Sequence, residues 1–179
     1  MNTDENPESS PTKGSLLRIL VYWLPVILIM ALIFAGSTRA FSGEKTGHWL
    51  IPIYQSIFPN AEMATLELLV FLTRKLAHVV EYAILSILCW RALTFAHRFP
   101  PPHWKKLTWN RRHAWLAFAI AALYGASDEL HQAFVPGRYS SFSDIIADSL
   151  GASIGLILIY WAVRLIQKSS HRNLISPDM

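Results

Sequence analysis

The chain has 179 residues, of which 53% are hydrophobic and 16% are charged, and its formal net charge is +4 at pH 7. This length fits one domain, and the single cysteine, Cys89, excludes an internal disulfide. The basic residues lie beside long apolar segments, so we expect them to face a membrane surface and expect no nucleic-acid partner.

Four apolar segments dominate the chain, and each reaches the roughly 20 residues that a helix needs to cross a membrane. They are 16–36, 76–95, 114–134 and 144–166. Apolar residues surround the middle of each segment instead of forming one stripe, which argues against a soluble helical bundle. We therefore predict an all-α fold, a membrane bundle of four transmembrane helices, with residues 16–166 as its transmembrane domain.

The polar segment 1–15 is predicted to be a disordered tail, and 167–179 a second tail. A cleavable signal peptide is the alternative for the first apolar segment, but that segment is longer than a typical signal core and follows acidic residues. Eleven basic residues lie near the two termini or in the 91–113 loop, whereas the loops expected on the other side of the membrane contain five. The positive-inside rule then places both termini and the 91–113 loop in the cytoplasm.

The segment between the first two spans is expected to lie on the outer side. Residues 41–47 are predicted to form a loop, and 48–58 are aromatic and interrupted by Pro52. Asn60 is a plausible N-cap for a short helix over Ala61–Thr73. That helix is too short to span, so we predict that it lies in the interface or re-enters the membrane.

The second span opens with a polar face in the outer half of the membrane. At helical spacing its members fall within about 120° of arc: Arg74, Lys75, His78, Glu81 and Tyr82. The third span carries a similar face near its outer end, over about 140°: Tyr124, Ser127, Asp128, His131 and Gln132, with Glu129 farther round. Pro136-Gly137 ends that helix, which leaves Arg138 in the turn.

The fourth helix is predicted to start at Ser141-x-x-Asp144, which has the form of a capping box. Asp144, Asp148, Gly151 and Gly155 share about 60° of its surface. The two glycines form a small-residue stripe that favours close helix packing. Asp148 lies one turn deeper than Asp144 and needs a proton or a cation there, so we predict that it lies close to His78.

These residues resemble the VanZ-like family of bacterial integral membrane proteins. The resemblance rests on Arg74-Lys75-x-x-His78-x-x-x-Tyr82 and on Asp128-Glu129-x-x-Gln132-x-Phe134-x-Pro136-Gly137-Arg138, followed by Asp144, Asp148, Gly151 and Gly155. It covers about residues 16–165 and implies a multi-pass protein of the bacterial plasma (inner) membrane. The name of the founding member is tied to resistance to teicoplanin, so the resemblance also implies an effect on glycopeptide-antibiotic susceptibility. The family has no settled biochemical activity.

We expect a polar outer-leaflet site that binds a membrane lipid with an anionic headgroup or a lipid-linked cell-wall precursor, because arginine recognises phosphate through its planar fork. The candidate ligand-binding residues are Arg74, Lys75, His78, Tyr82, Asp128, Glu129, Gln132, Arg138, Asp144 and Asp148.

Two alternatives stay open. The first is a membrane-embedded enzyme acting on an envelope lipid, with His78, Asp128 and Asp148 as candidate catalytic residues. The second is a purely structural role, in which Arg74, Lys75 and Arg138 neutralise the acidic residues and hold the helices together. We predict no cofactor and no metal, since the histidines of the 91–113 loop are irregularly spaced. The sequence does not indicate an oligomeric state.

Overall fold

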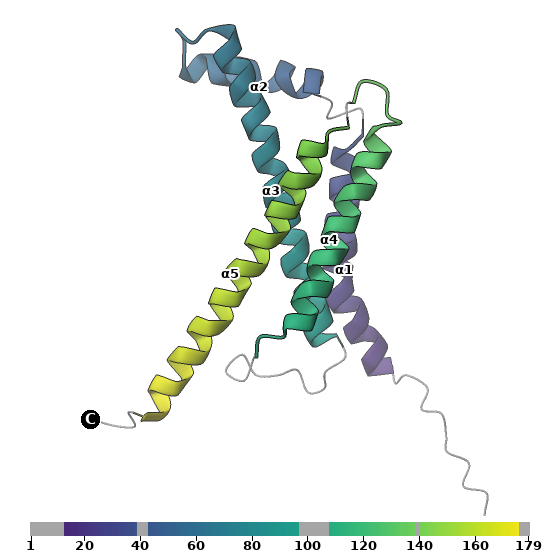
Figure 1. Ribbon diagram of the computed structural model, residues 1–179, viewed down its shortest axis with the longest axis vertical. Coiled ribbons are helices and arrows are strands. Elements are labelled where there is room, and N and C mark those ends of the chain that lie inside the picture. Colours follow the sequence, from purple (N-terminus) through teal and green to yellow (C-terminus); the bar gives the residue numbers. More distant parts are fainter. Residues whose placement is uncertain (1–12, 39–42, 97–107, 139, 176–179) are drawn as a thin grey trace, which may run out of the picture.

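The computed structural model describes residues 13–38, 43–96, 108–138 and 140–175, and the regular secondary structure in these ranges is α-helical (Figure 1). Its helices are α1 (Lys13–Gly36), α2 (Gly43–Ile57), α3 (Met63–Phe95), α4 (Arg111–Gln132) and α5 (Phe142–Ile175). Three of them, α1, α3 and α5, are long and apolar enough to cross a membrane. The all-α prediction is confirmed, and the helices have the character of a membrane protein.

Helix α4 is not among the candidate spans. Its 22 residues would reach about 33 Å at 1.5 Å per residue. Arg111 and Arg112 at its start, and Asp128 and Glu129 near its end, restrict the apolar part to the middle. Because α4 packs against both α3 and α5, it belongs to the bundle, while the four-span arrangement stays a prediction.

Large apolar side chains cover the outward faces of the spans. Leu32 in α1 is 67% exposed, and Leu165 in α5 is 65% exposed. A continuous apolar surface of this kind is unfavourable in water, but it suits the hydrocarbon core, where the backbone of each helix satisfies its own hydrogen bonds. These faces are therefore suited to contact with lipid.

The helices of the bundle alternate in direction. Helices α1 and α4 run toward the end of the molecule at which α2 lies, here called the α2 end, and α3 and α5 run away from it (Figure 1). Helix α1 begins and α5 ends at the opposite end. Chain segments that are far apart in sequence thus place their polar turns together at the α2 end.

Helices α3 and α5 cross and make the most extensive of the helix contacts (Figure 1). A Cβ on Gly151 would overlap the backbone of Val79, and one on Gly155 would overlap the backbone of Ala83. Small residues at both positions let the two backbones lie directly against each other. The crossing fixes the depth of the polar side chains that α3 and α5 carry.

The segment between the first two spans differs from the prediction. Helix α3 runs unbroken for 33 residues from its N-cap Glu62, so the separate helix expected over Ala61–Thr73 is wrong. No proline or glycine lies in that stretch to end a helix. The short helix is α2 instead, which includes part of the predicted 41–47 loop and accommodates Pro52.

Helix α3 reaches about 50 Å, whereas the hydrocarbon core is about 30 Å thick. Part of α3 therefore extends beyond the core, and α2 packs against α3. The side chain of Tyr54 in α2 hydrogen-bonds that of Thr73 in α3. An interfacial or re-entrant position for the short helix stays a prediction.

The predicted tails are partly helical, because α1 begins at Lys13 and α5 continues to Ile175. The remainder of the 1–15 and 167–179 tails, and residues 97–107 of the 91–113 loop with His97, His103 and its three prolines, lie outside the described residues.

Candidate functional site

Polar side chains from three helices and from the turn after α1 meet inside the bundle toward the α2 end. This polar cluster comprises Ser37 after α1, His78 in α3, Asp128 and Gln132 in α4, and Asp148 in α5. All of them except His78, which is partly exposed, are buried. The convergence expected from their helical spacing is present.

His78 and Asp148 join α3 to α5. The His78 Nδ1 atom lies 3.0 Å from Asp148 Oδ1, as the prediction of a close pair required. Asp148 is only 1% exposed. Helix α4 approaches it through Gly125, where a Cβ would lie 2.9 Å from Asp148 Oδ2 and 3.2 Å from Cε1 of Tyr82. A side chain at position 125 would therefore disturb the pair.

Asp128 joins α4 to the end of α1. Its Oδ2 atom accepts a hydrogen bond from Ser37 Oγ at 2.5 Å and another from Gln132 Nε2 at 2.8 Å. The Gln132 Oε1 atom in turn accepts from Arg138 Nη1 at 3.4 Å. Among the described residues, Asp128 is thus held by neutral donors and forms no ion pair.

Arg138 holds the end of α1. Its guanidinium donates to the backbone oxygens of Gly36 and Thr38, the latter from Nη2 at 3.1 Å. Gly137 precedes it with a φ of 80°, which a glycine adopts without strain. Burial lowers the pKa of the Arg138 guanidinium, and the nearby Arg74 acts in the same direction.

The contacts of Arg138 differ from the neutralising role that the purely structural alternative gives it. Within the described ranges, no ion pair joins Arg138 to a carboxylate, and the two ion pairs found are Lys75 with Asp144 and His78 with Asp148. Arg138 instead donates to the carbonyl oxygen of Gly36, in the last turn of α1, and to that of Thr38 just beyond it.

The start of α5 also differs in detail from the predicted capping box. Ser143 N donates to Ser141 Oγ at 3.3 Å, but Asp144 pairs with Lys75 instead of reaching back to Ser141. The Ser141 N–H donates to Glu129 Oε2 of α4 at 2.8 Å. Glu129 thus supplies from another helix the carboxylate that a capping box takes from its own third position.

Three carboxylates of this region are incompletely satisfied. Among the described residues, Asp128 Oδ1, Glu129 Oε1 and Asp148 Oδ2 are buried without a hydrogen-bond partner, as is the Tyr82 hydroxyl. Each such group costs about 1–3 kcal/mol of stability. Groups of this kind need an explanation other than stability, which favours a functional role over the purely structural alternative.

A cavity of about 420 Å³ lies between α1 and α3 beside the polar cluster. Its charged and titratable lining residues are Arg74, His78, Glu81 and Arg138. The apolar part of its wall includes Leu32, Ile33, Ala35 and Ala77. We call it the α1–α3 cavity.

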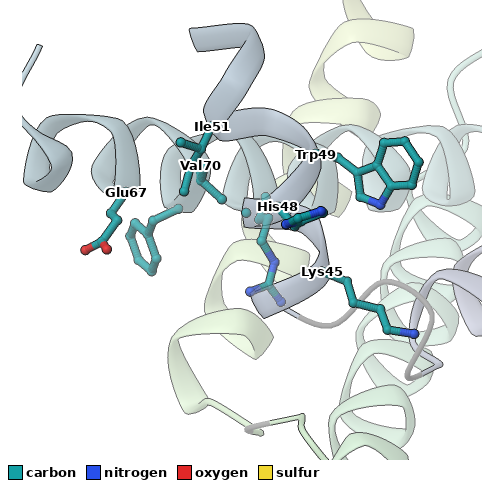
Figure 2. Close-up of a pocket in the computed structure, with 9 residues that line it drawn as sticks. Lys45, His48, Trp49, Ile51, Glu67 and Val70 are labelled. Atoms are coloured by element: carbon teal, nitrogen blue, oxygen red, sulfur yellow. The ribbon is translucent and has the colours of Figure 1, made fainter. Parts of the chain in front are cut away.

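A second cavity, of about 860 Å³, lies between α2 and α3. Figure 2 shows Lys45, His48 and Trp49 of α2 on one side and Glu67 and Val70 of α3 on the other. Arg74 lines this α2–α3 cavity as well as the α1–α3 cavity. It is partly buried, and no hydrogen bond or ion pair joins it to another residue that the structure describes.

The predicted site residues thus divide into four groups. Arg74, His78 and Arg138 line the α1–α3 cavity. Lys75 and Asp144 pair with each other, while Tyr82, Asp128, Glu129, Gln132 and Asp148 are buried in the bundle. Gly151 and Gly155 lie in the α3–α5 crossing. Within the described ranges no group of three or more His, Cys, Asp or Glu side chains is arranged to hold a metal ion.

Sequence reasoning missed the α2–α3 cavity, because Lys45, His48 and Trp49 form no recognisable motif. Glu81 was placed on the polar face but not among the ligand-binding candidates. Its spacing of three residues from His78 puts both on one side of α3, and this signal was present in the sequence.

A family model described as VanZ/LLP1 matches residues 22–164. No curated protein and no solved structure matches the chain. The matched range contains every residue of the polar cluster and both cavities.

Proposed function

The chain belongs to the VanZ/LLP1 family, and we propose that it binds an anionic envelope lipid or a lipid-linked cell-wall precursor. The observation that carries this proposal is the α1–α3 cavity, in which Arg74 and Arg138 face the same space. Two guanidinium groups offer planar arrays of N–H donors, which match the oxygens of a phosphate. One carboxylate, Glu81, lines the cavity beside them.

Arg74 is the residue best placed to grip such a headgroup. Most of the N–H donors of Arg138 are hydrogen-bonded to the end of α1, whereas Arg74 donates no hydrogen bond to another described residue. A partly buried cation without a partner is less favourable than a paired one, and an anionic ligand would supply that partner. Arg74 thus contributes charge to the ligand, and Arg138 fixes the wall.

The rest of the cavity supports an amphiphile over a small soluble anion. Leu32 and Ile33 line it from a helix that is apolar enough to span the membrane. An acyl or isoprenoid chain can lie along such a wall while the headgroup meets the arginines. The α2–α3 cavity shares Arg74 and adds about 860 Å³, which leaves room for a large headgroup.

We place this site in the outer leaflet of the bacterial plasma membrane, because the charge distribution puts the α2 end outside. Binding of a lipid-linked cell-wall precursor there would alter its availability to glycopeptide antibiotics. That route connects the site to antibiotic susceptibility.

The test replaces Arg74 with glutamine, which keeps a long polar side chain and removes the charge. The purified protein is incubated in detergent with phosphatidic acid or with phosphatidylcholine, and bound lipid is counted by native mass spectrometry. We expect the wild type to retain phosphatidic acid preferentially and Arg74→Gln to lose that preference, because the unpaired guanidinium is gone.

Arg91→Gln is the matched control. Arg91 lies on the same helix but away from the cavity, with its guanidinium 4.8 Å from the centre of the Tyr22 ring, so its loss should not change the preference. Equal lipid retention by wild type and Arg74→Gln, with both proteins folded, would contradict the proposal.

A further inference from the structure

We propose that the α1–α3 cavity also hydrolyses what it binds, releasing the terminal phosphoryl group of a lipid phosphate, with His78 as general base and Asp148 as its positioning residue. This proposal rests on the proposed function, because it requires an anionic lipid in the same cavity.

The first support is the geometry of the His78–Asp148 pair. The His78 Nδ1 atom meets Asp148 Oδ1 at 3.0 Å, and no hydrogen bond links Nε2 to a described residue. An ionised Asp148 accepts from Nδ1–H, which leaves the lone pair on Nε2. A carboxylate that fixes the tautomer and orientation of an imidazole in this way is a recurrent device of general-base catalysis.

The second support is how the pair is placed. His78 lines the cavity, whereas Asp148 is 1% exposed and lies behind it on α5. A ligand in the cavity therefore meets the imidazole and not the carboxylate. A pair that served only to join α3 and α5 would not need its histidine in the wall of a cavity.

The third support is the set of charged groups that line the cavity beside the imidazole. Arg74 and Arg138 line the same cavity, and guanidinium groups stabilise the charge that develops on a transferred phosphoryl group. Glu81 follows His78 by three residues, on the same side of α3, and lines the cavity too. The cavity thus contains a base, a group able to carry a proton, and two cations.

The step balances without a metal or redox partner. A water oxygen forms a bond to phosphorus while its proton passes to His78 Nε2. The bond between phosphorus and the lipid oxygen breaks, and that oxygen takes a proton from protonated Glu81. The proton on His78 returns through solvent to Glu81. The products are inorganic phosphate and the lipid without its terminal phosphoryl group.

The test measures release of inorganic phosphate by the purified full chain in detergent micelles, with phosphatidic acid and farnesyl diphosphate as probes. We expect release by the wild type and a loss of about 100-fold or more in His78→Ala, the usual contribution of a general base. Added imidazole should restore part of the activity, because it can enter the space that the side chain leaves. A purely structural histidine would show no such rescue.

Asp148→Asn tests positioning. It should lower kcat and leave KM unchanged, since Asp148 does not face the ligand. His131→Ala is the matched control and should retain activity. His131 packs against Phe34 with ring centres 4.8 Å apart and is not among the residues that line the α1–α3 cavity.

Lipid retention is measured in parallel on the same samples. Retention of phosphatidic acid without phosphate release from either probe would overturn hydrolysis and leave binding intact. Release that survives His78→Ala would also overturn it. Absence of both lipid retention and phosphate release would reject the proposed function, and the hydrolysis proposal with it.

Discussion

At the scale of single residues, Asp128 shows what holds the polar cluster together. It is 3% exposed, and its Oδ2 atom depends on Ser37 and Gln132 for hydrogen bonds. Ser37→Ala removes the shorter of the two bonds, which is one of the contacts between α4 and the end of α1. We expect a loss of about 1–3 kcal/mol in unfolding free energy, which thermal unfolding in detergent measures.

Ser127→Ala is the control for this substitution. Ser127 is exposed and, among the described residues, donates only to the Tyr124 carbonyl within α4, at 2.7 Å, so its loss should change stability little. Equal unfolding temperatures for the two variants would show that the Ser37–Asp128 contact does not stabilise the bundle.

Side-chain pairs could be predicted from the sequence where both partners are polar residues in otherwise apolar helices. His78 and Asp148 were expected to meet because each lies on a polar face of an apolar helix. The partners of Arg138 and Glu129 could not be predicted in the same way. Arg138 donates to backbone oxygens, and Glu129 accepts from a backbone N–H. Because backbone groups are the same at almost every residue, the sequence does not indicate which of them will be the partner.

At the scale of elements, the α3–α5 crossing is the most extensive helix contact and fixes how the two helices lie against each other. Gly155→Ala adds a methyl group that would overlap the Ala83 backbone and approach Ser86 Oγ. Backbone cannot move aside as a flexible side chain can, so we expect a loss of about 1–3 kcal/mol. The expected observation is a lower unfolding temperature in detergent, with weaker lipid retention because His78 and Asp148 separate.

Gly47→Ala in α2 is the matched control. A Cβ there would lie 3.7 Å from Cδ1 of Ile51, an ordinary contact, and alanine favours helix more than glycine does. It should be neutral or slightly stabilising. An unchanged unfolding temperature in Gly155→Ala would mean that α5 can shift on α3 at no cost.

Element boundaries were harder to predict than the existence of elements. The polar run Arg74-Lys75 looked like the edge of the membrane and was therefore taken as the edge of a helix. A membrane boundary does not end a helix, because it breaks no backbone hydrogen bond, and α3 continues through it. Pro52 looked like an interruption, yet α2 includes it.

At the scale of the whole molecule, the two ends of the bundle differ in character. The α2 end contains the polar cluster and both cavities. Aromatic rings gather where α3 ends and α4 begins: Trp90 stacks on Trp109 with ring centres 5.5 Å apart, and Trp109 meets Tyr160 at 5.2 Å. Rings of this kind favour the boundary between lipid and water, which suits the opposite surface of the membrane.

The difference between the two ends predicts how the molecule is oriented in the membrane. Helix α1 begins and α5 ends at the end away from α2 (Figure 1), so both termini should share one side. The excess of basic residues near that end assigns it to the cytoplasm. Single cysteines at Ser140, near the α2 end, and at Thr108, before α4, test the assignment, since both positions are exposed. The native Cys89 is the only cysteine in the chain and is buried, so it should not react.

In intact cells, a membrane-impermeant maleimide should label Ser140→Cys and leave Thr108→Cys unlabelled until the membrane is permeabilised. If Thr108→Cys is labelled from outside and Ser140→Cys is not, the α2 end faces the cytoplasm. The lipid site would then lie in the inner leaflet, where a cell-wall precursor attached to its carrier on the outer surface does not reach it. Labelling of both positions from outside would mean that α4 does not cross the membrane, which would reduce the bundle to the three spans that the structure supports by length and composition.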